Sequence, residues 1–257
     1  MACFDIYFFW VLGKIISRNV RLIFRPDWLP QRRFKMNFEW DTVSRDAVFI
    51  IGAGQFGSRA ARILSERDSQ VFIVDLNAER LSLLRTLPVR SIVYDGVRFL
   101  VENFAKFQEN SLIVPSVPLH LAFEWLRLSL QGTRKIVKTA VPVEAANRLP
   151  HHWPASEGSL LVSYADFACP DNCPEPEFCT VTGEERNVPL YEILRNLTHP
   201  EFHTYAIRSR QLAPGLGGYL VKDLQEMSDK VLHHEKGPFF LGTACKCHGI
   251  LTAFKLE

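Results

Sequence analysis

Three glycines at a fixed spacing give the clearest chemical signal in this chain. They follow an apolar run at Val48–Ile51 and precede a segment with helical periodicity. A strand, a G-x-G-x-x-G turn and a helix are together typical of dinucleotide-binding sites, because the glycines allow a tight turn, a close approach of pyrophosphate and close helix packing. The first N–H groups of such a helix bind phosphate. The predicted phosphate-binding residues are Gly52, Gly54, Gln55, Phe56 and Gly57. The alternative is a glycine-rich turn that binds nothing.

An acidic residue at the end of the next apolar run indicates which dinucleotide would bind. Asp75 lies 18 residues after Gly57, and no arginine directly follows it. A carboxylate in this place accepts hydrogen bonds from the adenosine ribose and repels a 2′-phosphate. The sequence therefore predicts NAD(H) rather than NADP(H), with Leu76 beside the acid. Arg59 and Arg62 are interpreted as solvated surface residues, with phosphate contact as the alternative.

A cluster of cysteines forms the second candidate site. Three cysteines fall within eleven residues of a proline-rich segment, and two more precede His248. Tetrahedral sulfur ligation suits zinc and iron–sulfur clusters. The predicted metal ligands are Cys169, Cys173, Cys179, Cys245 and Cys247, with an iron–sulfur cluster narrowly favoured over zinc. Reduced structural cysteines and a redox thiol pair stay open as alternatives, whereas disulfides are disfavoured in a reducing compartment.

The expected strands place both cysteine groups at one location. Cys169 follows a predicted strand at 159–164, and Cys245 follows one at 239–244. If both strands run parallel to the nucleotide-binding strands, the two groups emerge at the carboxyl edge of the sheet, where open α/β folds bind ligands.

Strand and helix patterns alternate along the chain with short spacers, which indicates an α/β fold with a doubly wound, mostly parallel Rossmann-type sheet, extended by further βα units. We expect an N-terminal extension at 1–40, a dinucleotide-binding domain at 41–150, and a cysteine-containing extension at 151–257. Expected strands beyond the motif lie at 90–94, 111–115, 135–141, 159–164, 202–207, 239–244 and 250–254. A glycine-rich stretch, Ser209–Gly218, is expected to be a loop that opens a helix at 218–232; an anion site there, with Arg208 or Arg210, is the less favoured interpretation.

The segments IIGAGQFGSRAARIL, VFIVDLNAERLSLL and SIVYDG resemble the TrkA-N family, the nucleotide-binding half of regulatory modules of potassium channels and transporters. In this resemblance Asp75 matches the ribose-binding acid and Glu79-Arg80 matches a helix start. Asp95 falls in the family's Gly-Asp-Ala segment, although Tyr94 replaces its first glycine. The similarity covers about residues 46–115. It implies NAD(H) or another adenine nucleotide as ligand and a gating or sensing role in relatives. We further expect a cytoplasmic location, and a homodimer or a membrane transporter as partner.

Charge is unevenly distributed along the chain. Residues 1–35 carry seven basic and two acidic side chains, whereas the remaining 222 residues carry 23 basic and 26 acidic ones. The acidic body gives no general case for nucleic-acid binding. The apolar run at 6–12 is too short to span a membrane. Two interpretations stand evenly: an interfacial helix in weak contact with anionic membrane, or an extension that precedes a natural start at Met36.

Two functions follow from these patterns. The favoured one is a regulatory NAD(H) sensor, because the chain shows no nucleophile elbow, Walker motif or H-E-x-x-H motif. The alternative is an NAD(H)-dependent oxidoreductase that uses the cysteine centre for electron transfer or substrate binding. His120, His151 and His152 are the only candidates for a hydride-transfer acid, and core or surface roles are the commoner outcome for such histidines.

Overall fold

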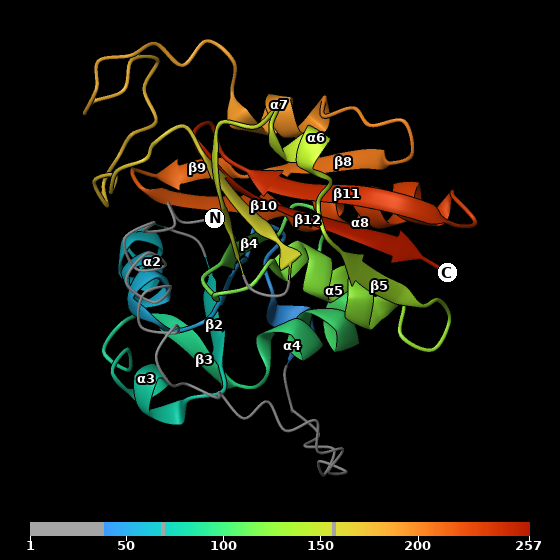
Figure 1. Ribbon diagram of the computed structural model, residues 1–257. Coiled ribbons are helices and arrows are strands. Elements are labelled where there is room, and N and C mark those ends of the chain that lie inside the picture. The colour runs from blue at the N-terminus through green and yellow to red at the C-terminus, as the bar shows by residue number, and fades with distance from the viewer. Residues whose placement is uncertain (1–38, 68–69, 156–157) are drawn as a thin grey trace, which may run out of the picture.

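A computed structural model describes residues 39–67, 70–155 and 158–257 of the chain. In these residues the chain forms two six-stranded sheets with helices around them (Figure 1). The predicted α/β, Rossmann-type fold class is confirmed. The predictions for residues 1–35 lie outside the described residues.

The first sheet contains the glycine motif. Four parallel strands lie in the order β3-β2-β1-β4, so the strand order reverses between β1 and β4. The strands are β1 (Val48–Ile51), β2 (Val71–Asp75), β3 (Val89–Val93) and β4 (Leu112–Pro115). The connecting helices are α2 (Gln55–Ser65), α3 (Ala78–Ser82), α4 (Gly96–Asn103) and α5 (Leu121–Ser129), with short 3-10 turns at Trp40–Thr42 and Phe104–Lys106. A reversal of strand order creates the crevice in which open α/β sheets bind ligands.

A hairpin extends the first sheet beyond β4. It consists of β9 (Arg210–Ala213) and β10 (Leu216–Leu220), and β10 pairs with β4 in the antiparallel sense. The expected loop at Ser209–Gly218 was therefore wrong, and the helix begins later, as α8 (Val221–Leu232). Gly215 supplies the turn of the hairpin with φ +68°, a conformation that favours glycine.

The second sheet holds most of the C-terminal half. Its order is β6-β7-β12-β11-β8, with β5 also paired to β12. The strands are β5 (Ile136–Thr139), β6 (His151–Pro154), β7 (Leu160–Ser163), β8 (His203–Arg208), β11 (Gly237–Ala244) and β12 (His248–Leu256). Only the β8–β11 pair is parallel. The expectation that these strands run parallel in the nucleotide-binding sheet was wrong. The three residues between β11 and β12 are too few for a parallel crossover, so these strands form a hairpin.

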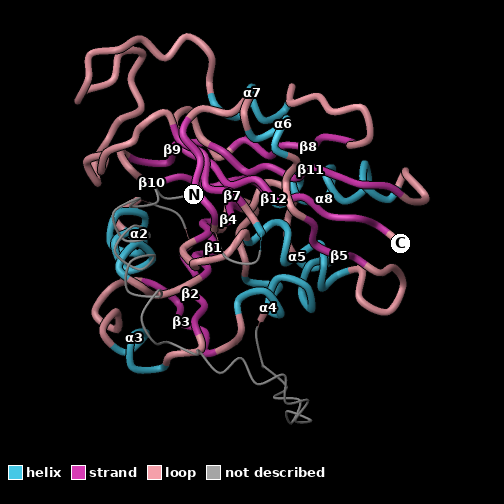
Figure 2. Tube along the Cα trace, in the orientation of Figure 1, coloured by secondary structure: helices cyan, strands magenta, loops and turns pink. Residues whose placement is uncertain are grey.

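The main hydrophobic core lies between the two sheets. It joins Phe49 and Phe72 of the first sheet to Phe239 and Phe254 of the second, with apolar side chains of α4, α5 and α8 between them. A second core covers the other face of the first sheet, under α2 and α3. A third lies on the outer face of the second sheet, under α7 (Leu190–Arg195) and close to α6 (Val143–Ala146). The chain between β7 and α7 carries three of the cysteines and forms the long loop at the upper left of Figure 2.

Candidate functional site

The three glycines of the turn occupy three different steric environments. A Cβ at Gly52 would overlap the carbonyl oxygen of Ser116, and Gly52 also has φ +103°. A Cβ at Gly57 would overlap the carbonyl oxygen of Gly52, so the helix packs directly on the turn. A Cβ at Gly54 would meet no atom within 4 Å. Gly52 and Gly57 are thus needed by the protein itself, whereas Gly54 borders open space at the start of α2.

The start of α2 lies beside that open space at Gly54. Gly54 is the residue before the helix, and Gln55 and Phe56 open its first turn. The first N–H groups of an α-helix have no partner within the helix, and they carry its positive dipole end. Gly57, Ala60, Ala61 and Leu64 repeat at helical spacing and are buried, which fixes the axis of α2 against the sheet.

Asp75 ends β2 beside the glycine turn, where its carboxylate is held by the backbone. Oδ2 accepts a hydrogen bond from the Ala53 N–H at 2.6 Å, and Oδ1 accepts one from the Asn77 N–H at 2.7 Å. A carboxylate oxygen has two lone pairs, so each oxygen keeps capacity for a ribose hydroxyl. Leu76 follows with 68% of its surface exposed, which leaves an apolar side chain next to the acid.

Asp95 has a structural role in α4. Its Oδ1 accepts a hydrogen bond from the Arg98 N–H at 2.8 Å and so caps the helix.

Ser116 and Val117 were missed by the sequence reasoning, yet they lie against Gly52 across the strand-order reversal. The position of Ser116, directly after β4, was the available signal.

Arg59 links the nucleotide-binding helix to the hairpin. Its Nη2 donates to the Pro214 carbonyl oxygen at 2.9 Å at the exposed surface, so this surface arginine also contacts the hairpin. The same hairpin contacts the cysteine loop, because the Gly215 N–H donates to the Cys173 carbonyl oxygen at 2.8 Å. Gln211 Nε2 donates to that oxygen at 3.0 Å. A continuous set of contacts therefore runs from α2 to the cysteine loop.

Two cysteines from distant parts of the chain meet at one histidine. Cys169 Sγ lies 3.3 Å from His248 Nε2, and Cys245 Sγ lies 4.0 Å from His248 Nδ1. Cys245 and His248 are buried, and Cys169 is half-buried. The meeting of the two cysteine groups was predicted. Its location differs, because β7 and β11 both run antiparallel to β12 and end at the same edge of the second sheet.

The cluster perturbs several protonation equilibria. Burial opposes a charged ring at His248, but its contacts with Cys169 and Cys245 outweigh burial and raise its pKa to about 10. Burial, reinforced by Cys245, raises the pKa of Glu175 to about 8. Burial likewise raises the pKa of the Cys247 thiol to about 12. Glu175 is a member of this cluster that the sequence did not single out.

The predicted set of five metal ligands is not assembled in the structure. Within residues 39–67, 70–155 and 158–257, no group of three or more Cys, His, Asp or Glu side chains is placed to hold a metal ion. Cys179 instead contacts Thr182, Val181 and Arg186. These hydrogen bonds outweigh its burial and lower its pKa to about 7. His248 directs one ring nitrogen to each of two sulfurs, which is a hydrogen-bonded arrangement. Zinc and an iron–sulfur cluster therefore stay predictions without structural support.

The candidate hydride-transfer histidines lie in the second sheet or against it. His120 is buried, and its Nδ1 and Nε2 lie 2.8 Å and 2.9 Å from the hydroxyls of Thr252 and Thr243. Burial, with Lys138 nearby, lowers its pKa to about 3. His120 thus joins the end of the first half to the second sheet. His151 and His152 lie on β6 of that second sheet.

Two family matches cover consecutive parts of the chain. Residues 48–113 match the TrkA-N domain, which confirms the resemblance. Residues 122–257, more than half of the chain, match AF_1314_C, described as "Uncharacterized protein, C-terminal domain". The chain belongs to the AF_1314_C family. An uncharacterized protein of Archaeoglobus fulgidus is 32% identical over 219 residues, which cover 80% of this chain and 98% of that relative.

This AF_1314_C family member therefore combines a TrkA-N nucleotide-binding module with the family's C-terminal domain. The TrkA-N match ends at 113, within β4, and the AF_1314_C match begins at 122, within α5. No helix in the described part of the chain is long and apolar enough to cross a membrane.

Proposed function

We propose that this protein is an NAD(H)-binding regulatory subunit, in which the dinucleotide binds at the glycine turn of the TrkA-N module. The observation that carries the proposal is the contrast among the glycines. Gly52 and Gly57 are required by backbone contacts, whereas the Cβ position of Gly54 is open. This open position lies at the start of α2, where helix N–H groups bind phosphate.

Asp75 supports NAD(H) as the dinucleotide. Its two hydrogen bonds to backbone N–H groups hold the carboxylate at the end of β2. A carboxylate held there accepts hydrogen bonds from the ribose hydroxyls and repels a 2′-phosphate. Leu76 offers an exposed apolar side chain for one face of the adenine.

A regulatory role is favoured over catalysis by two features. His120 has no access to a bound cofactor, because both of its nitrogens are bonded in the core. The contacts through Arg59, Pro214, Gly215 and Cys173 connect the dinucleotide helix to the AF_1314_C domain. A ligand that orders the start of α2 would act on this set of contacts. A membrane transporter or a second copy of the chain as the regulated partner is proposed on the TrkA-N match alone.

The test is calorimetric titration with NADH and NAD⁺, followed by measurement of the 340 nm absorbance after prolonged incubation. The proposal expects saturable 1:1 binding and no loss of NADH. Oxidation of NADH at a rate proportional to protein concentration would instead favour the oxidoreductase. Gly54→Val is the binding-deficient control, because its side chain would project into the open space without a clash within the protein.

For the cysteines, we propose a cluster of reduced thiols around His248 that fixes the cysteine loop to the turn between β11 and β12. The contacts of Cys169 and Cys245 with the two nitrogens of one ring support this arrangement. The competing prediction, a zinc or iron–sulfur centre, is tested by elemental analysis and absorption spectroscopy of protein purified without oxygen. Stoichiometric zinc, or iron with acid-labile sulfide, would replace the thiol cluster. Bleaching of an iron–sulfur band by NADH would also restore the oxidoreductase function.

A further inference from the structure

The second sheet has an open edge at β8. In the described residues β8 is the last strand of the sheet, and β11 is its neighbour. α7 packs on one face of the strand and α8 on the other (Figure 1). The outer N–H and C=O groups of an edge strand are a template for pairing with a further strand.

Side chains of β8 alternate between the two helices. The Thr204 hydroxyl donates to the Leu197 carbonyl oxygen at 2.6 Å, just beyond α7. Arg208, on the same face, lies 4.7 Å from the ring centroid of Tyr191. Tyr205 points the other way, where its hydroxyl donates to the Lys230 carbonyl oxygen at 3.3 Å. The edge of β8 therefore forms the floor of a cleft with one helix on each side.

This cleft has a volume of about 690 Å³ and carries positive charge on both walls. Arg195 and Arg208 lie on the α7 side and Lys230 on the α8 side, and all three are exposed. None of them forms an ion pair within the described ranges. Arg210 is already paired with Asp223. The walls also carry two carboxylates, those of Glu192 and Glu226.

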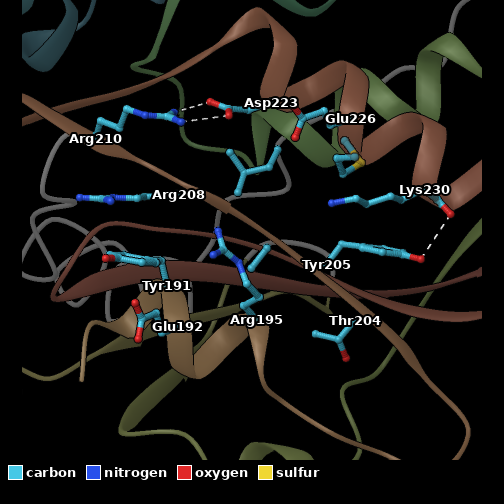
Figure 3. A pocket seen from close by; sticks show the side chains of 13 residues that line it. Tyr191, Glu192, Arg195, Thr204, Tyr205, Arg208, Arg210, Asp223, Glu226 and Lys230 are labelled. Carbon is cyan, nitrogen blue, oxygen red and sulfur yellow. Dashed lines mark hydrogen bonds and ion pairs between the residues drawn. The ribbon is translucent and has the colours of Figure 1, made fainter. Parts of the chain in front are cut away.

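The cations are distributed along the cleft. Figure 3 shows the head group of Arg208 toward the left of the view, and those of Arg195 and Lys230 nearer its centre, where they come from opposite walls. A single small anion needs donors that converge on one point. An extended strand, in contrast, directs successive side chains to opposite sides, and so reaches cations on both walls.

Two other occupants are disfavoured by charge. A second copy of this chain, paired through its own β8, would bring two sets of the same three cations together, and Glu192 and Glu226 would not balance them. The N-terminal segment 1–35 has five more basic than acidic side chains and would be repelled as well. An acidic segment is complementary.

We propose that the edge of β8 is a docking site for an extended acidic segment of a partner protein. The segment adds a strand to the second sheet through main-chain hydrogen bonds, and its carboxylates pair with Arg195, Arg208 and Lys230. This inference is independent of NAD(H) binding and extends the function of the AF_1314_C domain to partner recognition.

The test is biolayer interferometry of the full chain on immobilised hexapeptides in which adjacent Glu-Glu pairs are separated by Val, Thr or Tyr, so that carboxylates face both walls of the cleft. We expect saturable binding that weakens with salt, as charge pairing requires. The double variant Arg195→Glu/Arg208→Glu should lower affinity about tenfold or more, since close charge pairs are reversed to repulsion. Arg85→Glu, an exposed charge reversal on the TrkA-N module, should bind like the wild type. Circular dichroism verifies that each variant is folded.

Peptides N-methylated at alternate backbone amides separate strand pairing from simple charge attraction. The proposal expects one of the two methylation patterns to abolish binding, because it removes the N–H groups that face β8. Equal binding of both methylated patterns would reduce the site to a patch for anions and overturn strand addition. Absence of binding across the acidic set would also overturn the proposal. The proposal would also be overturned if analytical ultracentrifugation showed a dimer for the wild type and a monomer for the Arg195→Glu/Arg208→Glu variant. The occupant of the cleft would then be a second copy of the chain.

Discussion

The buried histidine between the two sheets makes a quantitative prediction about acid stability. His120 has an ordinary pKa of 6.5, and burial lowers it to about 3 in the folded protein. Between these values the unfolded chain binds a proton that the folded chain does not, so the free energy of unfolding falls as the pH falls below 6.5. One pKa unit corresponds to about 1.36 kcal/mol. From pH 7 to pH 5, this one group should therefore remove about 2 kcal/mol of stability.

The assay is urea unfolding followed by tryptophan fluorescence, at pH 7 and at pH 5, on the wild type and on His120→Gln. The variant has no titrating ring, but its amide can bond to the hydroxyl of Thr243 or Thr252. It should be less stable at pH 7 by about 1–3 kcal/mol, because one of the two buried threonine hydroxyls loses its hydrogen bond to the ring. The loss between pH 7 and pH 5 should be smaller than in the wild type by about 2 kcal/mol.

Groups that titrate equally in both proteins cancel in this comparison. His248 and Glu175 have raised pKa values, but they are the same in the wild type and the variant. An identical pH dependence in the two proteins would refute the reasoning, because it would mean that the His120 ring is accessible to protons in the folded state.

Two further predictions concern the nucleotide module, and a third concerns the ion pair between Glu124 of α5 and Lys138 of β5. Gly57→Ala should lower the free energy of unfolding in urea by about 3 kcal/mol, because the added Cβ overlaps the Gly52 carbonyl oxygen. Gly54→Ala should change the free energy of unfolding by less than about 1 kcal/mol. It should weaken NADH binding about tenfold. Equal stability of the two variants would contradict the steric assignment. Asp75→Asn should bring the affinities for NADH and NADPH closer together in calorimetry, and an unchanged ratio would remove Asp75 from ribose recognition. Glu124→Gln should lower the free energy of unfolding, measured by thermal unfolding, by about 3 kcal/mol, because this nearly buried carboxylate pairs with Arg127 and Lys138. An unchanged free energy of unfolding would show that solvent screens both ion pairs.

The nucleotide module could be predicted from sequence because its signals are local. The run at Val48–Ile51, the three glycines and Asp75 fall within 28 residues, and each has a steric or electrostatic reason that operates over a few neighbours. The structure joins Asp75 to the glycine turn through the hydrogen bond from the Ala53 N–H. Ser116 lies 59 residues beyond Gly57 along the chain, and only the pairing of β1 with β4 brings it to the turn.

The second sheet could not be predicted in the same way, because strand pairing is non-local. The periodicity at 239–244 correctly indicates a strand, but it does not tell which partner that strand takes. The short connection through Cys245 and Cys247 did carry a hairpin signal, since a parallel crossover needs a dozen or more residues. The cysteine pattern was correct in bringing Cys169 near Cys245. It did not reveal that His248 would lie between them with one nitrogen toward each sulfur.

The most direct test of the central claim is hydrogen–deuterium exchange measured by mass spectrometry with and without NADH. NADH bound at the TrkA-N module should protect the backbone at the start of α2 and at the residues just after Asp75. Weaker protection is expected at the β9–β10 hairpin, which Arg59 connects to α2. Protection confined to the β8 cleft, or saturable binding with no change at residues 52–57, would contradict the account.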